Sequence, residues 1–115
     1  MTLPEEGFLL RIFIGERDKH DGMPLYEWLV TKARELHLAG ATVVRGIMGF
    51  GARSRIQSFK IERLSTDLPI IVEVVDTEDK LDAFLRVIDN QIKDGLVTME
   101  KAQIRLYRSG SPEQP

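Results

Sequence analysis

The stretch PIIVEVVD at residues 69–76 constrains the fold more than any other part of the sequence. Side chains along a β-strand point alternately to two faces of the sheet, so a strand with one wet face alternates apolar and polar residues. Here both sets of alternate positions are mainly Ile and Val, with Glu73 as an exception in the middle. Such a strand is typical of a sheet that is covered on both faces. The fold must therefore include two covering layers.

The remaining periodicities predict three more strands and two helices around this segment. Apolar runs at residues 8–15, 41–47 and 96–107 indicate strands, the second of them rich in β-branched residues. Gly40 and Gly95 are expected to follow the helices, where a left-handed residue often ends the last turn. The helical stripes are Leu25, Trp28, Leu29, Ala33 and Leu36 in the first helix, and Leu81, Phe84, Leu85, Ile88 and Ile92 in the second.

The resulting order, βαββαβ, predicts an α+β fold of the ferredoxin-like type. In that sandwich one antiparallel sheet has both helices on the same face. Because one helical layer covers only one face, we expect a second copy of the chain to cover the other, with the sheets packed together in a homo-oligomer. We expect one domain over residues 1–108 and a flexible C-terminal tail over residues 109–115.

The composition of the 115 residues argues against several classes of function. No cysteine is present, which excludes disulfides, thiolate metal sites and cysteine nucleophiles. A formal net charge of −2 argues against the broad basic face of a nucleic-acid-binding protein. No apolar run approaches the roughly 20 residues of a membrane span, and the first residues do not resemble a secretory signal. We therefore expect a cytoplasmic protein with no nucleic-acid partner and no membrane insertion.

A glycine-rich stretch, RGIMGFGARSR at residues 45–55, follows the second predicted strand. Its glycines, Gly46, Gly49 and Gly51, run in the reverse order of the dinucleotide-binding fingerprint, and the chain contains no P-loop motif. Glycines in a left-handed conformation would let backbone N–H groups converge on an anion, and the neighbouring arginines would add charge. The alternative is a glycine hinge at the base of a long loop over residues 49–68.

The polar segment GERDKHDG at residues 15–22 contains carboxylates and one histidine, which are side chains that bind divalent metals. The adjacent Arg17 and Lys19 repel a cation, so we expect no metal site here. The same two positive side chains are candidate phosphate contacts instead.

Two arginines, Arg105 and Arg108, flank a tyrosine at the end of the last predicted strand. They are either solvated charges at the exit of the strand or groups that reach an anion held by a neighbouring subunit. The sequence contains no recognisable nucleophile motif and no acid–base pair. We therefore expect no catalytic residue and no enzymatic activity.

Four segments resemble the PII-like domain-of-unknown-function family. They are GERDKHDGMPLYEWL, AGATVVRGIMGFG, DLPIIVEVVDTEDKL and GLVTMEKAQIRLY, and the resemblance covers about residues 8–108. It implies a ferredoxin-like subunit in a homotrimer that binds an adenine nucleotide in clefts between subunits. It also implies that the loop over residues 49–68 corresponds to the T-loop, through which PII proteins signal to a membrane transporter or an enzyme.

The resemblance also implies which residues bind the nucleotide. Residues 49–51 match the GFG at the loop base, and Arg105 and Arg108 match the terminal arginines that reach phosphates from the next subunit. Ala52 and Arg53 stand where PII proteins usually have arginine and glutamine, so the choice between AMP, ADP and ATP stays open. The expected nucleotide-binding set is Gly46, Gly49, Phe50, Gly51, Arg53, Arg105 and Arg108, with Arg17, Lys19 and Arg55 as further phosphate contacts.

The same fold leaves two alternative functions. A CutA-like trimer would bind a metal ion, and a small enzyme would place its active site between subunits. Sharing a fold is a weak argument for either function. Under the nucleotide hypothesis no cofactor is required, because the adenine nucleotide is a regulatory ligand.

Overall fold

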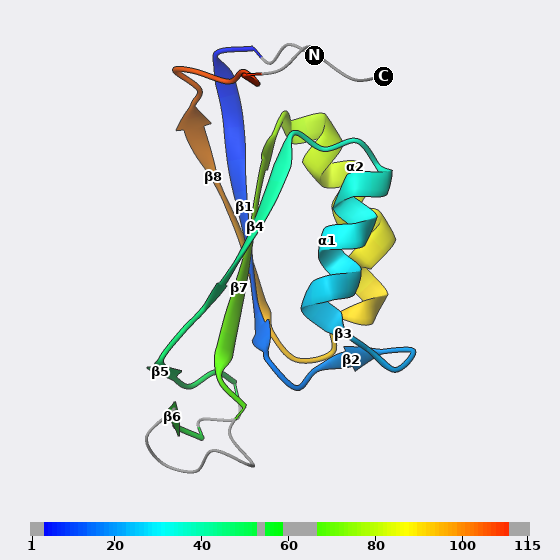
Figure 1. Cartoon of the computed structure of the whole chain (residues 1–115), viewed down its shortest axis with the longest axis vertical. Helices are drawn as coiled ribbons and strands as arrows, with labels where there is room; N and C mark the ends of the chain where they lie inside the picture. Colours follow the sequence, from blue (N-terminus) through cyan, green and yellow to red (C-terminus); the bar gives the residue numbers. More distant parts are fainter. Residues whose placement is uncertain (1–3, 53–54, 59–66, 111–115) are drawn as a thin grey trace.

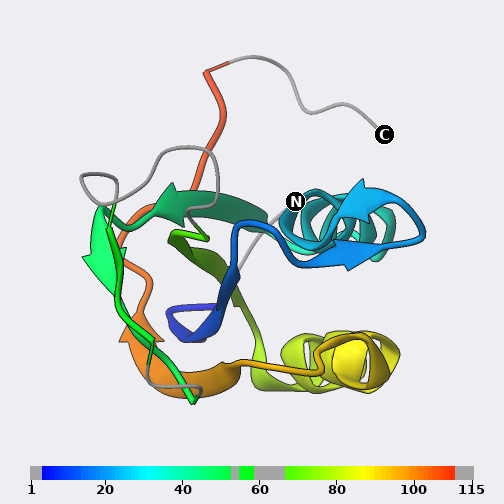
Figure 2. The ribbon, with the colours of Figure 1, turned by 90° about the horizontal axis from the view of Figure 1, so that it is seen from below.

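The computed structural model describes residues 4–52, 55–58 and 67–110 of the chain. Its main sheet has four antiparallel strands in the order β4-β7-β1-β8. Both helices lie on one face of this sheet (Figures 1 and 2). The structure therefore confirms the predicted ferredoxin-like α+β sandwich. The main elements are β1 (Glu6–Gly15), α1 (Leu25–Glu35), β4 (Gly40–Arg45), β7 (Pro69–Asp76), α2 (Glu78–Ile88) and β8 (Leu96–Gln103).

Two short hairpins lie at the end of the sheet where the long loop begins (Figure 1). A hairpin of β2 (Lys19–His20) and β3 (Met23–Pro24) follows β1. A second hairpin pairs β5 (Met48–Gly49) with β6 (Gln57–Ser58) at the base of the loop. A 3₁₀ turn, η1 (Asp89–Gln91), extends α2 toward β8.

The core lies between the sheet and the helices. Along β7 burial alternates strictly, and Ile70, Val72 and Val74 are almost fully buried against the helical layer. The intervening residues are half-buried in the single chain. The predicted stripes supply the helical side of the core, and their fully buried members are Leu25, Leu29, Ala33, Leu81, Phe84 and Ile88.

Both helices end earlier than the two glycines predict. After α1, His37 adopts the left-handed conformation with a φ of 59°, and Gly40 already belongs to β4. Leu36 lies beyond the end of the helix and is 38% exposed, so it does not belong to the buried stripe. Gly95 precedes β8, where a Cβ atom would lie 2.5 Å from the carbonyl oxygen of Phe13. The close approach of β1 therefore explains this glycine.

The last strand is also shorter than predicted. β8 ends at Gln103, Ile104 still pairs with Glu5 beside the start of β1, and residues 105–110 cross the end of the sheet instead of extending it (Figure 1). The Ile104 N–H donates to the Glu5 carbonyl at 2.6 Å, and the Tyr107 hydroxyl donates to the Ala39 carbonyl at 2.7 Å. Residues 111–115 of the predicted tail lie outside the described residues. No helix within the described ranges is long and apolar enough to cross a membrane.

Candidate functional site

The glycine-rich stretch leaves β4 and packs on the first residue of β7. The Gly46 N–H donates to the Pro69 carbonyl at 2.7 Å, and a Cβ atom on Gly46 would lie 2.8 Å from the Pro69 ring. A Cβ on Gly49 would lie 3.2 Å from the same ring. Neither glycine has a positive φ, and neither does Gly51. Contact with Pro69 therefore explains the first two glycines, and the left-handed anion cradle considered from the sequence does not form here.

Apolar side chains are exposed around this loop base. Ile47, Met48 and Phe50 are each at least 60% exposed, and Ile56 is 53% exposed. Gly51 faces open space, because no atom lies within 4 Å of the position that its Cβ would take. An exposed aromatic ring beside an open glycine is a surface on which a flat ring can lie.

The turn that follows β1 holds the exit of the loop. Within it, the Glu16 N–H donates to the Leu68 carbonyl, and the Arg17 N–H donates to Asp67 Oδ1, both at 2.8 Å. Asp67 also packs on the turn itself, because a Cβ on Gly15 would lie 2.7 Å from the same oxygen. Asp67 was not among the sequence-predicted site residues, since only the return of the loop to the sheet brings it to this turn.

Side chains also connect the segments at the base of the loop. Arg45 at the end of β4 forms an ion pair with Glu16, with Nη1 3.2 Å from Oε2. The Gln57 side-chain oxygen accepts a hydrogen bond from the Asp67 N–H at 3.1 Å. Entry and exit of the loop are thus fixed against the rigid sheet.

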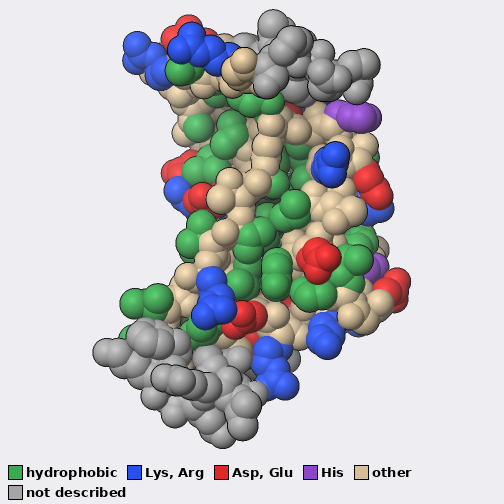
Figure 3. Space-filling model, in the orientation of Figure 1, with side chains coloured by type: hydrophobic (Ala, Val, Ile, Leu, Met, Phe, Trp, Pro, Cys, Tyr) green, Lys and Arg blue, Asp and Glu red, His purple; other side chains and the backbone are tan. Residues whose placement is uncertain are grey.

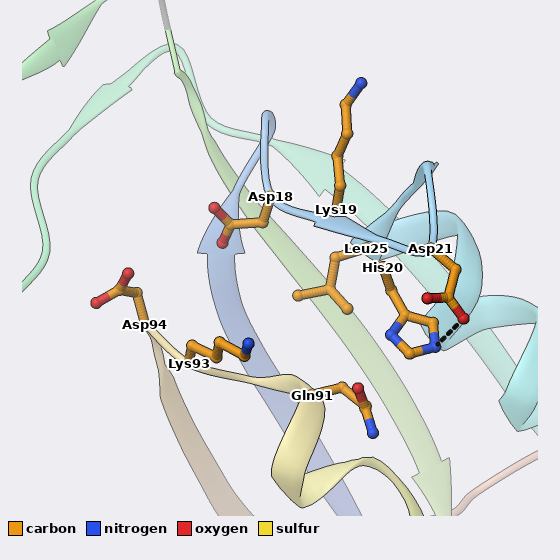
Figure 4. A pocket seen from close by; sticks show the side chains of 8 residues that line it. All are labelled: Asp18, Lys19, His20, Asp21, Leu25, Gln91, Lys93 and Asp94. Carbon is orange, nitrogen blue, oxygen red and sulfur yellow. Dashed lines mark ion pairs between the residues drawn. The ribbon is translucent and has the colours of Figure 1, made fainter.

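A pocket of about 400 Å³ lies between the segment that follows β1 and the segment between α2 and β8 (Figure 4). Nε2 of His20 lies 3.5 Å from Oδ2 of Asp21, and the His20 ring is tilted by 47° against the Trp28 ring, with 4.4 Å between ring centroids. The side chain of Lys19 points away from the other lining residues (Figure 4). Within the described residues, no three His, Cys, Asp or Glu side chains are grouped to bind a metal ion. The lining residues are Asp18, Lys19, His20, Asp21, Leu25, Gln91, Lys93 and Asp94.

The two late arginines lie at the opposite end of the sheet from the glycine stretch. Arg105 and Arg108 are exposed on the segment that follows β8, beside the start of β1. The glycine stretch follows the end of β4, beside the start of β7. An eight-residue strand spans roughly 25 Å, so one nucleotide does not reach both groups within one subunit.

The remaining predicted phosphate contacts lie at the loop end. Arg17, Lys19 and Arg55 are exposed there, and Arg53 lies outside the described residues. In the space-filling view, Lys and Arg side chains lie toward both ends of the molecule and also along its flanks, and apolar side chains gather at the centre of the face shown (Figure 3). The structure thus places the predicted residues in two groups, one at each end.

Sequence comparison identifies the family. The model of the DUF190 family, described as "Uncharacterized ACR", matches residues 7–104. The chain belongs to this family. A UPF0166 protein of Aquifex aeolicus is 40% identical over 96 residues, which cover 84% of this chain and 90% of that protein. A UPF0166 protein of Methanocaldococcus jannaschii is 34% identical over 97 residues, covering 84% and 89%.

Solved structures show a PII-like fold. CPII, a nitrogen regulatory PII-like protein from Thiomonas intermedia, superposes with a TM-score of 0.67 at 16% identity, covering 86% of this chain and 88% of that one. A putative PII-like signaling protein from Thermus thermophilus gives a TM-score of 0.60 at 16% identity, covering 86% and 89%. The DUF190 chain therefore has the same fold as these PII-like proteins, as the sequence resemblance implies.

Proposed function

We propose that this DUF190 protein is a regulatory protein that binds an adenine nucleotide between subunits of a homotrimer. The observation that carries the proposal is the separation of its two candidate half-sites. The loop base offers Phe50 beside the open Gly51, and the other end of the sheet offers Arg105 and Arg108. Arg105 and Arg108 would reach the loop base only from a second copy of the chain, where they would add to the positive charge of Arg17, Lys19 and Arg55.

The ligand class is supported by the structural neighbours. The CPII structure with the TM-score of 0.67 is described as bound to ADP, AMP and bicarbonate. A second CPII structure is described as bound to ADP and bicarbonate. In the present chain, Phe50 would stack on the adenine ring, and the two arginines of the neighbouring subunit would bind the phosphates through charge-assisted hydrogen bonds.

The output of the proposed site is the loop over residues 49–68. Its entry packs on Pro69, and its exit is fixed by the turn after β1. A nucleotide at the base would favour those loop conformations that leave room for it, and would shift the loop toward them by its differential affinity. A membrane transporter or an enzyme would recognise the shifted loop. The protein needs no catalytic residue for this role.

Titration calorimetry with AMP, ADP and ATP tests the proposal. We expect micromolar binding of at least one of the three, which corresponds to about −8 kcal/mol. Gly51→Val should abolish binding, because the valine side chain would occupy the open space proposed for the nucleotide. It should leave stability unchanged, because no protein atom lies within 4 Å of the position of its Cβ. Arg86→Ala on α2 is a control, because that arginine is exposed and lies on the helical layer. No binding of any of the three nucleotides at millimolar concentration would refute the proposal.

A mixing experiment tests whether the site is shared between subunits. One chain has Gly51→Val, and the other has Arg105→Ala with Arg108→Ala. Neither chain should bind nucleotide alone, whereas a mixed oligomer contains boundaries at which both half-sites are intact. Recovery of binding after the chains are unfolded and refolded together supports a shared site. Binding that stays absent in a verified mixed oligomer contradicts it.

A further inference from the structure

The pocket of about 400 Å³ beside the β2–β3 hairpin has the size of a small-molecule site, for which roughly 300–1,000 Å³ is typical. Leu25, almost fully buried at the start of α1, gives the pocket an apolar wall. Its N–H donates to the Asp18 carbonyl at 2.7 Å, which joins the hairpin segment to the helix. Lys19 points away from the other lining residues, and the lining includes neither Phe50 nor the two late arginines (Figure 4). The residues that face the pocket are therefore different from those of the proposed nucleotide site.

Charged side chains of both signs line the remaining walls of the pocket. Asp18 and Asp94 lie on one side of it in Figure 4. His20 and Gln91 lie on the other side, and the Lys93 side chain extends between the two. A simple cation in the pocket would face Lys93, and a simple anion would face the two carboxylates. Opposite charges on one molecule can each meet a complementary side chain through charge-assisted hydrogen bonds, so the lining favours a zwitterion.

The turn over residues 15–18 joins one wall of the pocket to the exit of the long loop. Asp18 Oδ2 accepts a hydrogen bond from the Gly15 N–H at 3.0 Å, and the Asp18 N–H donates to the Gly15 carbonyl at 3.2 Å. In the same turn, the Glu16 and Arg17 N–H groups hold residues 67–68 through bonds of 2.8 Å. Opening of this turn would therefore release the loop exit and displace Asp18 from the pocket at the same time.

We propose that this pocket binds a small zwitterion, a short aliphatic chain with one ammonium and one carboxylate group, and that the bound ligand keeps the loop exit fixed. The ammonium group contacts the carboxylates of Asp18 and Asp94. A carboxylate offers about four lone-pair sites, so Asp18 can accept this contact and keep its bond within the turn. The ligand's own carboxylate contacts Lys93 and Gln91, and its methylene groups lie on Leu25.

The effect on the loop follows from mass action. A ligand that binds only when the turn is intact stabilises the intact turn in proportion to its concentration over its dissociation constant. Occupancy of the pocket would therefore reduce local opening at residues 67–68. Binding in the pocket does not depend on the proposed nucleotide site, and only the effect on a partner protein rests on the proposed role of the loop.

Titration calorimetry with a matched set of small molecules tests the ligand class. Glycine, β-alanine and γ-aminobutyrate are zwitterions of increasing length, and butylamine and butyrate each have the carbon chain of γ-aminobutyrate with one of its charges. At least one zwitterion should bind, and it should bind at least about tenfold more tightly than either singly charged molecule, which lacks one charge-assisted contact. Butylamine that binds as tightly as the zwitterions would overturn the assignment. Absence of binding by all three zwitterions at millimolar concentration would overturn it as well.

Substitutions on both segments test the location of the site. Lys93→Gln and Asp18→Asn should each weaken binding of the zwitterion at least about tenfold, because each removes one charge from the lining. Lys80→Gln and Asp79→Asn are the matched controls, because both residues are exposed in the first turn of α2, at the far end of that helix from the pocket. If Asp18→Asn disturbs the turn, Lys93→Gln still decides, because Lys93 is exposed on the other segment. Equal effects of the substitutions and their controls would contradict binding in this pocket.

Hydrogen exchange tests the coupling to the loop. With the zwitterion at about ten times its dissociation constant, exchange of the Glu16 and Arg17 N–H groups should slow by about tenfold, because opening of the turn then requires release of the ligand. The Ile104 N–H, which donates to Glu5 at the other end of the sheet, should exchange at an unchanged rate. Binding without selective protection of the turn would refute the coupling. Nucleotide binding enters none of these measurements, so this inference and the proposed function are refuted by different results.

Discussion

Gly46 and Pro69 join the two strands that enter and leave the long loop. The Gly46 N–H donates to the Pro69 carbonyl at 2.7 Å, and the Pro69 ring occupies the space where a side chain at residue 46 would begin. Proline has no backbone N–H, so Pro69 cannot donate a hydrogen bond back to Gly46. The bond from the Gly46 N–H to the Pro69 carbonyl is therefore the only backbone hydrogen bond that this pair can form. The hydrogen bond and the ring contact together make this the fixed point from which the loop departs.

Gly46→Ala should therefore destabilise the fold. A Cβ atom at 2.8 Å from the Pro69 ring overlaps a rigid group, and overpacking of this kind costs about 1–3 kcal/mol. Gly51→Ala serves as the control, because nothing lies within 4 Å of its Cβ position. Urea denaturation of the two variants gives the difference in unfolding free energy. Equal stability of the two variants would contradict the importance of the Gly46–Pro69 contact.

The overall fold could be predicted because the hydrophobic pattern alone determines it. The strand at residues 69–76 was recognisable from its Ile and Val content, and its bounds match those of β7. The ends of the helices were harder to predict, because they depend on single backbone conformations. His37 adopts the left-handed turn expected of Gly40, and Gly95 is required by the nearby Phe13 carbonyl. Neither relationship has a local sequence signal.

The candidate site could be predicted only in part for a similar reason. The alternation in residues 104–107 resembles a continued strand, but Ile104 packs over Gly7 and Tyr107 bonds to Ala39 across the end of the sheet. The Arg11–Glu73 pair depends on the register between two strands 62 residues apart in sequence. A usable signal was that each of these two charges interrupts an otherwise apolar run.

The second prediction concerns Asp76, a fully buried carboxylate at the end of β7. Its two oxygens accept hydrogen bonds from the Ala39 N–H at 2.8 Å and the Thr77 N–H at 2.6 Å. Asp76→Ala should leave two donors unsatisfied and lower the unfolding free energy by about 2–3 kcal/mol. Asp79→Ala, an exposed change in the first turn of α2, should cost less than about 1 kcal/mol. Thermal unfolding measures both, and a similar loss in each would refute the role of Asp76.

The third prediction concerns Asp67 at the exit of the loop. Asp67→Ala removes the acceptor of the Arg17 N–H and should cost about 1 kcal/mol of stability. Hydrogen exchange should accelerate at Arg17 and Glu16, because the turn after β1 loses its hold on the loop. Exchange in the buried strand β7 should stay unchanged. Uniform acceleration over the whole chain would instead indicate global destabilisation.

The last prediction concerns Tyr107, which fixes the segment that contains the two late arginines. Tyr107→Phe removes the hydroxyl that donates to the Ala39 carbonyl and should reduce stability by no more than about 1 kcal/mol. Nucleotide affinity should fall more than stability does. Without the Tyr107 hydrogen bond, Arg105 and Arg108 must be ordered when the nucleotide binds, and this loss of conformational entropy weakens binding. We expect nucleotide affinity to fall while the midpoint of unfolding hardly changes. Tyr26→Phe, a matched change on α1, should leave affinity unaltered, and equal affinity losses in both variants would disprove the coupling.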